Sequence, residues 1–119
     1  MLLPGPDHPI SISEEPRTVR VMFNGKVVAE TSRALLLAEA AYPPVHYIPR
    51  EDARIEHFTP TRHETGCPYK GTASYFTLEV EGKRSENAVW SYEKPYPAVA
   101  KIAGMLAFYP QRIDAIEIS

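Results

Sequence analysis

The dipeptide Asn24-Gly25 constrains the fold more than any other feature of this sequence. Both residues tolerate a positive φ angle, which the two central positions of a type I′ turn require. The dipeptide lies between VRVMF and KVVAET, and apolar residues occupy every second position of the first segment. Such alternation is typical of a strand with one buried face. The sequence therefore predicts a β-hairpin with a two-residue turn, in which Val21 faces Val28 and Met22 faces Val27.

Alternating apolar residues predict a second hairpin later in the chain. They run over 76–80, Gly82-Lys83 supplies a turn, and the alternation resumes over 88–92. Shorter strands are expected in SRALLLAEAAYPPV, VHYIPRED and ARIEHFTP, and at the end of the chain over 116–118. The first of these segments also contains good helix formers. We favour a strand there, because the run is short and ends at Pro-Pro.

The segment PAVAKIAGMLAFYP is the one predicted helix. Pro97 suits the first turn of a helix, and Pro110 ends it. Val99, Ile102 and Leu106 fall on one face at helical spacing. We therefore expect a mainly β chain, a β-rich α+β fold in which this C-terminal helix packs on a small antiparallel sheet.

Chain length and charge limit the classes of function. The 119 residues fit one domain, and the single cysteine cannot form an internal disulfide. A net charge of -2 gives no electrostatic reason to expect nucleic acid, and no apolar run approaches the roughly 18 residues of a membrane span. We expect a cytoplasmic protein that binds neither nucleic acid nor membrane. Residues 1–16 should form an extended, proline-rich arm, lying on the body or mobile, and residues 17–119 a single domain.

Residues 63–71 hold the strongest candidates for chemistry. The segment HETGCPYKG contains the only cysteine, one of four histidines and a lysine beside a glycine. It has the glycine spacing of a phosphate-binding loop, but the lysine that should follow the second glycine is missing and a strand follows instead of a helix. We expect a loop here, with Lys70, Cys67 and His63 as candidate catalytic residues.

Cys67 and Lys70 each allow two interpretations. Arg62, His63 and Lys70 would lower the pKa of the Cys67 thiol if the loop folded them together. A free cysteine is more often a small buried apolar residue, however. Lys70 can bind a phosphate or carboxylate as a point charge, and Gly71 permits close backbone approach; the alternative is a solvated lysine in a turn. We favour Lys70 as the functional residue.

A metal site is a weaker interpretation of the same region. His57, His63 and Cys67 would supply three ligands, but the chain has one cysteine and no Cys-x-x-Cys, so a closed zinc site lacks its fourth ligand. We therefore predict no metal and no cofactor.

Aromatic residues with a polar atom form a second group of candidates. They are Tyr42, Tyr47, Tyr69, Tyr75, Trp90, Tyr92, Tyr96 and Tyr109. Most such rings pack in a core with the polar atom at the surface. If some of them line a concavity with Arg50, Lys70 and Glu93, they form a pocket for a planar or anionic small molecule.

Four segments carry a resemblance to a known family: VRVMFNGKVVAET, YPPVHYIPREDARIE, CPYKGTASYF and ENAVWSYEKPYPAVAKIAGMLAFYP. Together, over Arg17 to Ile118, they resemble DUF427, a family of small bacterial and fungal domains of unknown function. The combination of CPYKG with a later W-x-Y and IAGxxAFY is its most specific part. The resemblance implies a tent-like or barrel-like sheet. It marks as characteristic the positions Tyr47, Pro49, Cys67, Tyr69, Lys70, Gly71, Trp90, Tyr92, Gly104, Phe108 and Tyr109.

Some classifications label the same family a nucleotidyltransferase. Nucleotidyl transfer usually relies on carboxylates that hold metal ions about 3.5–4 Å apart. Glu51-Asp52 is the only adjacent carboxylate pair after the arm, and neighbours on a strand point to opposite faces. The residues therefore give this label little support.

Two main functions remain. We prefer a small-molecule pocket formed by the 63–71 loop, the 47–50 segment and the Trp90–Tyr92 strand. Its expected ligand-binding residues are Tyr47, Arg50, Tyr69, Lys70, Gly71, Trp90 and Tyr92. The alternative is a non-catalytic module that binds another protein. The pocket requires the rings and Lys70 to converge in a concavity, whereas the module requires an open patch of several hundred Å².

Overall fold

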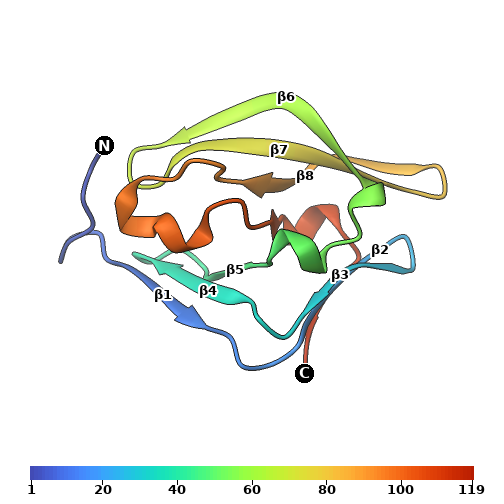
Figure 1. The fold of residues 1–119 in the computed structure, drawn as a ribbon, viewed down its shortest axis with the longest axis horizontal. Helices are drawn as coiled ribbons and strands as arrows, with labels where there is room; N and C mark the ends of the chain where they lie inside the picture. The colour runs from blue at the N-terminus through green and yellow to red at the C-terminus, as the bar shows by residue number, and fades with distance from the viewer.

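The computed structural model describes all of residues 1–119. Ten strands pair antiparallel in three small sheets, ordered β1-β4-β5, β10-β2-β3 and β6-β7-β8-β9 (Figure 1). The strands are β1 (Ile10–Glu14), β2 (Val19–Phe23), β3 (Lys26–Thr31), β4 (Leu35–Glu39), β5 (Val45–Tyr47), β6 (Phe58–Cys67), β7 (Gly71–Val80), β8 (Lys83–Ser91), β9 (Ala107–Phe108) and β10 (Ala115–Ile118). The fold is mainly β, as predicted, and no sheet closes into a barrel.

Four short 3-10 helices connect some of these strands. They are η1 (Arg50–Asp52), η2 (Ile55–His57), η3 (Pro97–Ile102) and η4 (Pro110–Arg112). The strand expected in ARIEHFTP was partly wrong, because the middle of this segment forms η2 and the strand β6 begins only at Phe58. No helix in the structure combines the length and the apolar character that crossing a membrane requires.

The hairpin at Asn24-Gly25 is confirmed. Its two turn residues have φ angles of 49° and 76°, and Met22 faces Val27 as predicted. Val21, however, faces Ala29 instead of Val28, because a β-bulge separates Val21 from Met22 in the pairing. The bulge lets two consecutive residues of β3 be buried, which strict alternation forbids.

The second predicted hairpin is β7-β8, with its turn one residue earlier than expected. Glu81 and Gly82 adopt positive φ angles, and Val80 faces Lys83. The predicted loop over 63–71 was wrong, since His63–Cys67 is the end of β6 and Gly71 begins β7. Only residues 68–70 form the turn between them.

The predicted C-terminal helix was wrong. Residues 97–102 form only the 3-10 helix η3, which is kinked at Val99, and Gly104 has a φ of +70°. Leu106 then exchanges two backbone hydrogen bonds with Ile48, both 2.8 Å, and β9 pairs with β8. Pairing with distant strands therefore satisfies the backbone groups that a helix would have satisfied internally.

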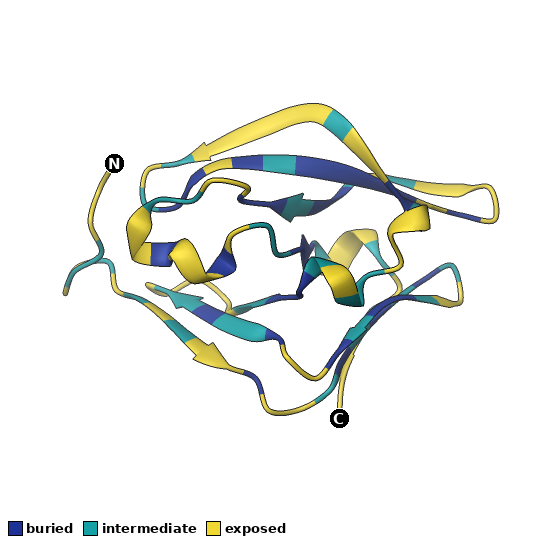
Figure 2. Ribbon diagram, viewed as in Figure 1, coloured by how far each residue is buried: buried dark blue, intermediate teal, exposed yellow.

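The segment SRALLLAEAAYPPV forms the strand β4, as favoured. It lies between β5 and β1, and β1 comes from the proline-rich arm, so residues 10–14 are part of a sheet. Burial along the strands is uneven: β7 is largely buried, whereas β6, which runs along its outer side, is largely exposed (Figure 2).

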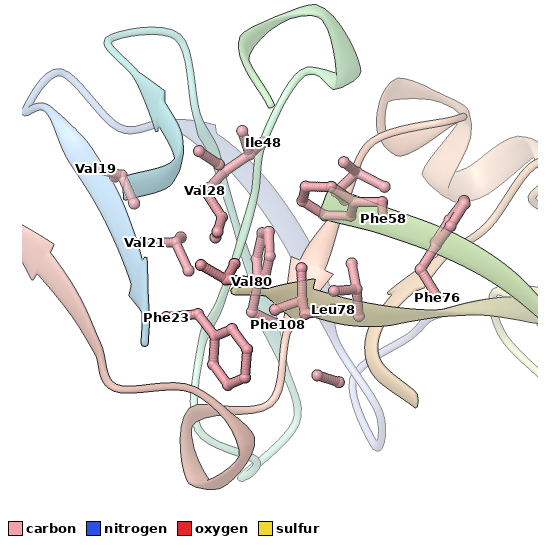
Figure 3. Close-up of a cluster of buried hydrophobic side chains, with 14 of the residues drawn as sticks. Val19, Val21, Phe23, Val28, Ile48, Phe58, Phe76, Leu78, Val80 and Phe108 are labelled. Carbon is pink, nitrogen blue, oxygen red and sulfur yellow. The ribbon is translucent and has the colours of Figure 1, made fainter. Parts of the chain in front are cut away.

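Two clusters of buried apolar side chains hold the fold together. The larger one joins β2 and β3 to β7 and includes Val21, Val28, Leu78 and Phe108 (Figure 3). The smaller one brings together buried residues of β4, β5, β7 and η3 with Tyr92, which follows β8. Three of the eight buried residues in the smaller cluster are tyrosines. It therefore places polar hydroxyl groups inside the fold.

Candidate functional site

A cavity of about 200 Å³ lies within the smaller cluster. The strands β4 to β8 all contribute to its wall. Six of its lining residues are aromatic: Tyr42, Tyr47, Tyr75, Trp90, Tyr92 and Tyr109. Glu39 and Lys70 are its charged lining residues. We call this the aromatic cavity.

Hydrogen bonds between side chains fix most of the rings. The Trp90 indole Nε1 donates to the Tyr47 hydroxyl at 3.3 Å, and the two rings are nearly perpendicular. The Tyr75 hydroxyl bonds both the Thr65 hydroxyl, at 2.8 Å, and the Tyr109 hydroxyl, at 3.0 Å. Rings held in this way form a preformed wall.

Tyr92 is the one buried ring of the cavity whose polar atom bonds no protein group; the Tyr42 hydroxyl is also unpaired, but Tyr42 is mostly exposed. Burial raises the pKa of Tyr92, and that of Tyr47, well above the ordinary value for a tyrosine. Burial and the neighbouring Tyr75 hydroxyl raise the pKa of Tyr109 to about 12. These hydroxyl groups therefore stay protonated at neutral pH, and Tyr92 is free to donate to a ligand.

Lys70 pairs with Glu39 at the edge of the aromatic cavity. The Lys70 Nζ donates to Glu39 Oε1, and the two side chains are only 11% and 12% exposed. His8 Nε2 donates to the other carboxylate oxygen, Oε2, at 2.8 Å. The Lys70 Nζ also lies 5.8 Å from the centroid of the Tyr92 ring. Lys70 is thus a largely buried, paired lysine and not a solvated turn residue.

The pKa of Glu39 reflects two opposing effects. Burial alone would raise it, since the charged form loses hydration. Hydrogen bonds from Lys70 and His8, together with their charge, outweigh burial and lower the pKa below the usual value of a glutamate. Glu39 is therefore ionised at neutral pH.

Four of the predicted ligand-binding residues line the aromatic cavity together. They are Tyr47, Lys70, Trp90 and Tyr92. Tyr69 lies outside it, in a second cavity of about 350 Å³ that shares Glu39, Tyr42 and Lys70 with the first. We call this the outer cavity.

Arg50 and Gly71 are not at either cavity. Arg50 donates to Glu93 at 2.6 Å and to the Gly104 carbonyl oxygen at 3.1 Å, so its guanidinium group ties η1 to the segment after η3. Gly71 has a φ of +114°, and a Cβ atom there would lie 3.5 Å from the Lys94 carbonyl oxygen. The structure thus gives both residues a structural role.

The candidate catalytic residues His63 and Cys67 are far apart. They are four residues apart on β6, so their backbones are about 13 Å apart at the rise of a strand. The His63 ring lies edge-on to Tyr75, and Cys67 is half-buried at the outer cavity. No three His, Cys, Asp or Glu side chains are grouped so that they could hold a metal ion.

A comparison with protein families matches residues 11–119 to the model described as Domain of unknown function (DUF427). The chain belongs to the DUF427 family. No curated protein matches the sequence. The matched range contains every residue of the aromatic cavity, whereas His8 lies before it.

The nucleotidyltransferase label has no carboxylate cluster to support it in this DUF427 domain. Glu51 and Asp52 lie on η1, not on a strand as assumed from the sequence, and both bind Arg33 Nη2 at 3.1 Å. Asp52 also accepts a hydrogen bond from the Thr31 hydroxyl at 2.6 Å. Both carboxylates are therefore used to hold η1 in place, and we derive no step of nucleotidyl transfer from them.

Three residues that line the aromatic cavity or the outer cavity were not predicted from the sequence: Glu39, Thr65 and His8. Glu39 had a signal, since it is the only charge in the apolar run LLLAEAAY and a buried charge needs a partner. Thr65 and His8 had none, because their partners Tyr75 and Glu39 become neighbours only through strand pairing and the path of the arm.

Proposed function

We propose that this DUF427 domain binds a small planar molecule that carries a carbonyl or carboxylate group. The observation that carries the proposal is the position of two groups with free donors at one cavity with aromatic walls: the Lys70 ammonium, which keeps two N–H groups beyond its bond to Glu39, and the Tyr92 hydroxyl. The rings would contact the flat faces of the ligand, and the two donors would bind its acceptor group.

The volume of the aromatic cavity supports a small ligand. Pockets for drug-sized molecules have about 300–1,000 Å³, and this cavity has about 200 Å³. A single ring or a bicyclic system therefore fits better than a nucleotide. The same limit argues against a nucleoside triphosphate as the ligand of this cavity.

The charge balance of the cavity supports a carbonyl or carboxylate over a phosphate. Lys70 has three N–H donors, and Glu39 accepts one of them. Two donors remain, but the adjacent Glu39 carboxylate neutralises much of the positive charge. A doubly charged phosphate would be repelled by that carboxylate more strongly than a neutral or singly charged group.

The burial of the rings argues against the alternative of a protein-interaction module. Such a module needs its aromatic residues on an open patch. Tyr47 and Tyr92 are buried and Trp90 is half-buried, and among the rings of this cavity only Tyr42 is mostly exposed, at 65%. The rings therefore suit a small ligand better than a flat protein surface.

A fragment screen by NMR tests the proposal. We expect planar carboxylates and amides to shift the indole N–H signal of Trp90 and the backbone signals of Lys70 and Tyr92. Saturated analogues of equal size should bind more weakly, since they lack the flat face. Fragment hits that consistently shift signals elsewhere, and leave the Trp90 indole unchanged, would contradict the proposal.

A further inference from the structure

One wall of the outer cavity is the His8 side chain, which is held by three other residues of that wall. The His8 imidazole lies flat on the Tyr69 ring, with ring centroids 3.8 Å apart and planes within 3° of parallel. Tyr42 meets the same imidazole edge-on, with centroids 6.4 Å apart. The His8 Nε2 donates to Glu39 Oε2 at 2.8 Å. The imidazole is therefore held by its face, its edge and one ring N–H.

His8 is brought to the cavity by a segment with few anchors. Residues 1–9 precede β1 and lie at the end of the molecule where β6 turns into β7 (Figure 1). The Leu2 N–H donates to the Pro68 carbonyl oxygen, and the Ala40 N–H donates to that of Pro9, both at 2.8 Å. Met1, Leu2 and Leu3 are exposed. This segment can leave the body at the cost of few contacts.

The groups that hold the imidazole belong to the family domain, and the imidazole does not. Glu39, Tyr42 and Tyr69 all lie within the matched residues 11–119, whereas His8 lies before them. We propose that these three residues form a binding site for a planar nitrogen heterocycle with a ring N–H, such as an imidazole, pyrrole or purine, and that His8 fills this site as an internal ligand.

The chemistry of the three groups defines the ligand class. A tyrosine ring stacks on any flat ring, but an ionised carboxylate that is largely removed from water needs an N–H or O–H donor. A heterocycle without a ring N–H would leave Glu39 Oε2 without its partner. The site should therefore distinguish heterocycles by the ring N–H and not by shape alone.

An external ligand must displace His8 before it can bind. An external heterocycle competes with a side chain of the same molecule. Its apparent affinity is therefore its intrinsic affinity multiplied by the fraction of molecules in which His8 is released. Removing the His8 ring should therefore strengthen binding. This site adjoins the aromatic cavity: both cavities include Glu39, Tyr42 and Lys70, but Tyr69 lines only the outer one and Tyr92 only the aromatic one.

Rescue of His8→Ala by imidazole tests the proposal. We expect imidazole, at several times its dissociation constant, to raise the melting temperature of His8→Ala by about 3 °C. The shift should be less than half as large for the unchanged chain. Thiazole, a flat ring of similar size without an N–H, should give almost none. Adding Glu39→Gln to His8→Ala replaces the carboxylate by an uncharged acceptor and should clearly reduce the imidazole effect. Equal shifts with imidazole and thiazole, or in both proteins, would overturn the proposal.

The thiol of Cys67 provides a second measurement, because it lines the outer cavity. Its alkylation by iodoacetamide should be at least about threefold faster in His8→Ala than in the unchanged chain, and imidazole should slow it again. If His8→Ala does not fold, Tyr69→Leu, which removes the stacking surface, should show the same faster alkylation. An unchanged rate in the folded variant would contradict the claim that His8 covers this wall of the cavity. Tyr92→Phe should leave the imidazole effect intact, which separates this proposal from that for the aromatic cavity.

Discussion

Lys70 lies in a turn, but its surroundings differ from those of an ordinary solvent-exposed turn lysine. It forms a largely buried ion pair with Glu39, so removing its charge leaves a carboxylate without its main partner. We predict that Lys70→Met lowers the free energy of unfolding by about 3 kcal/mol, measured by urea denaturation. Replacing both residues, Lys70→Met with Glu39→Leu, should recover most of this loss. Lys101→Met is the matched exposed control and should change little. A single Lys70→Met variant as stable as the unchanged chain would contradict the pairing.

Glu39 should also make the domain sensitive to acid. Its pKa is lowered in the folded state, so its contribution to stability is fully present above the unfolded pKa, about 4.3, and is lost as the pH falls through the lower folded pKa. We expect the melting temperature to fall below about pH 4.5, and to fall less steeply in Glu39→Gln. Glu56→Gln, on an exposed residue, should keep the original slope. Identical acid slopes for Glu39→Gln and the unchanged chain would contradict this account.

Gly71 and Gly66 offer a matched pair of residues on one hairpin. Gly71 has a φ of +114°, which L-residues rarely adopt, whereas Gly66 has no positive φ, and a Cβ atom added there would have no neighbouring atom within 4 Å. We predict that Gly71→Ala lowers the free energy of unfolding by about 1–3 kcal/mol, while Gly66→Ala has little effect. Calorimetry of both variants measures the difference. Equal stability would show that the φ angle at Gly71 relaxes without cost.

At the scale of elements, the hairpins were predictable and the C-terminal segment was not. Asn24-Gly25 and the alternation around it are local signals, so they identify β2, β3 and their turn without any knowledge of the rest of the fold. Residues 97–110 carry helical spacing, but Leu106 pairs with Ile48 and β9 pairs with β8. Those partners are distant in sequence, so no local pattern reveals them.

The turn at Asn24 joins two hairpins and yields a further prediction. The Asn24 side-chain amide donates to the Val80 carbonyl oxygen at 2.9 Å, at the end of β7. Asn24→Ala loses both this bond and the tolerance of positive φ, and should lower the free energy of unfolding by about 1–2 kcal/mol. Asn24→Gly loses only the bond and should lower it by less. If Asn24→Gly is the more harmful change in urea denaturation, the backbone argument is wrong.

At the scale of the whole molecule, the site was predictable only in part. Tyr47, Lys70, Trp90 and Tyr92 could be chosen from aromatic content and from the DUF427 resemblance, and they line one cavity. Arg50 could not be excluded from the sequence, because its partner Glu93 is 43 residues away. The sequence marks Glu39 only as an isolated charge in an apolar run, because no local pattern shows that β4 faces the turn before β7.

The smaller buried cluster also explains why the cavity and the fold are linked. Tyr47 and Tyr92 belong both to the cluster and to the cavity wall, so the rings that would contact a ligand also stabilise the packing of β4, β5 and η3. Large changes to these rings would therefore confuse loss of binding with loss of stability. Removing a single hydroxyl group changes the chemistry of the cavity and leaves its shape almost unchanged.

The most direct test of the central claim is the dissociation constant of a planar carboxylate, identified by the NMR screen, for Tyr92→Phe. The account predicts that affinity falls about threefold to tenfold, because one hydrogen bond to the ligand is lost. Tyr96→Phe, which removes a hydroxyl group outside the aromatic cavity, should bind as the unchanged chain does. Equal affinity in Tyr92→Phe, or an equal loss in Tyr96→Phe, would contradict the claim that the Tyr92 hydroxyl binds the ligand.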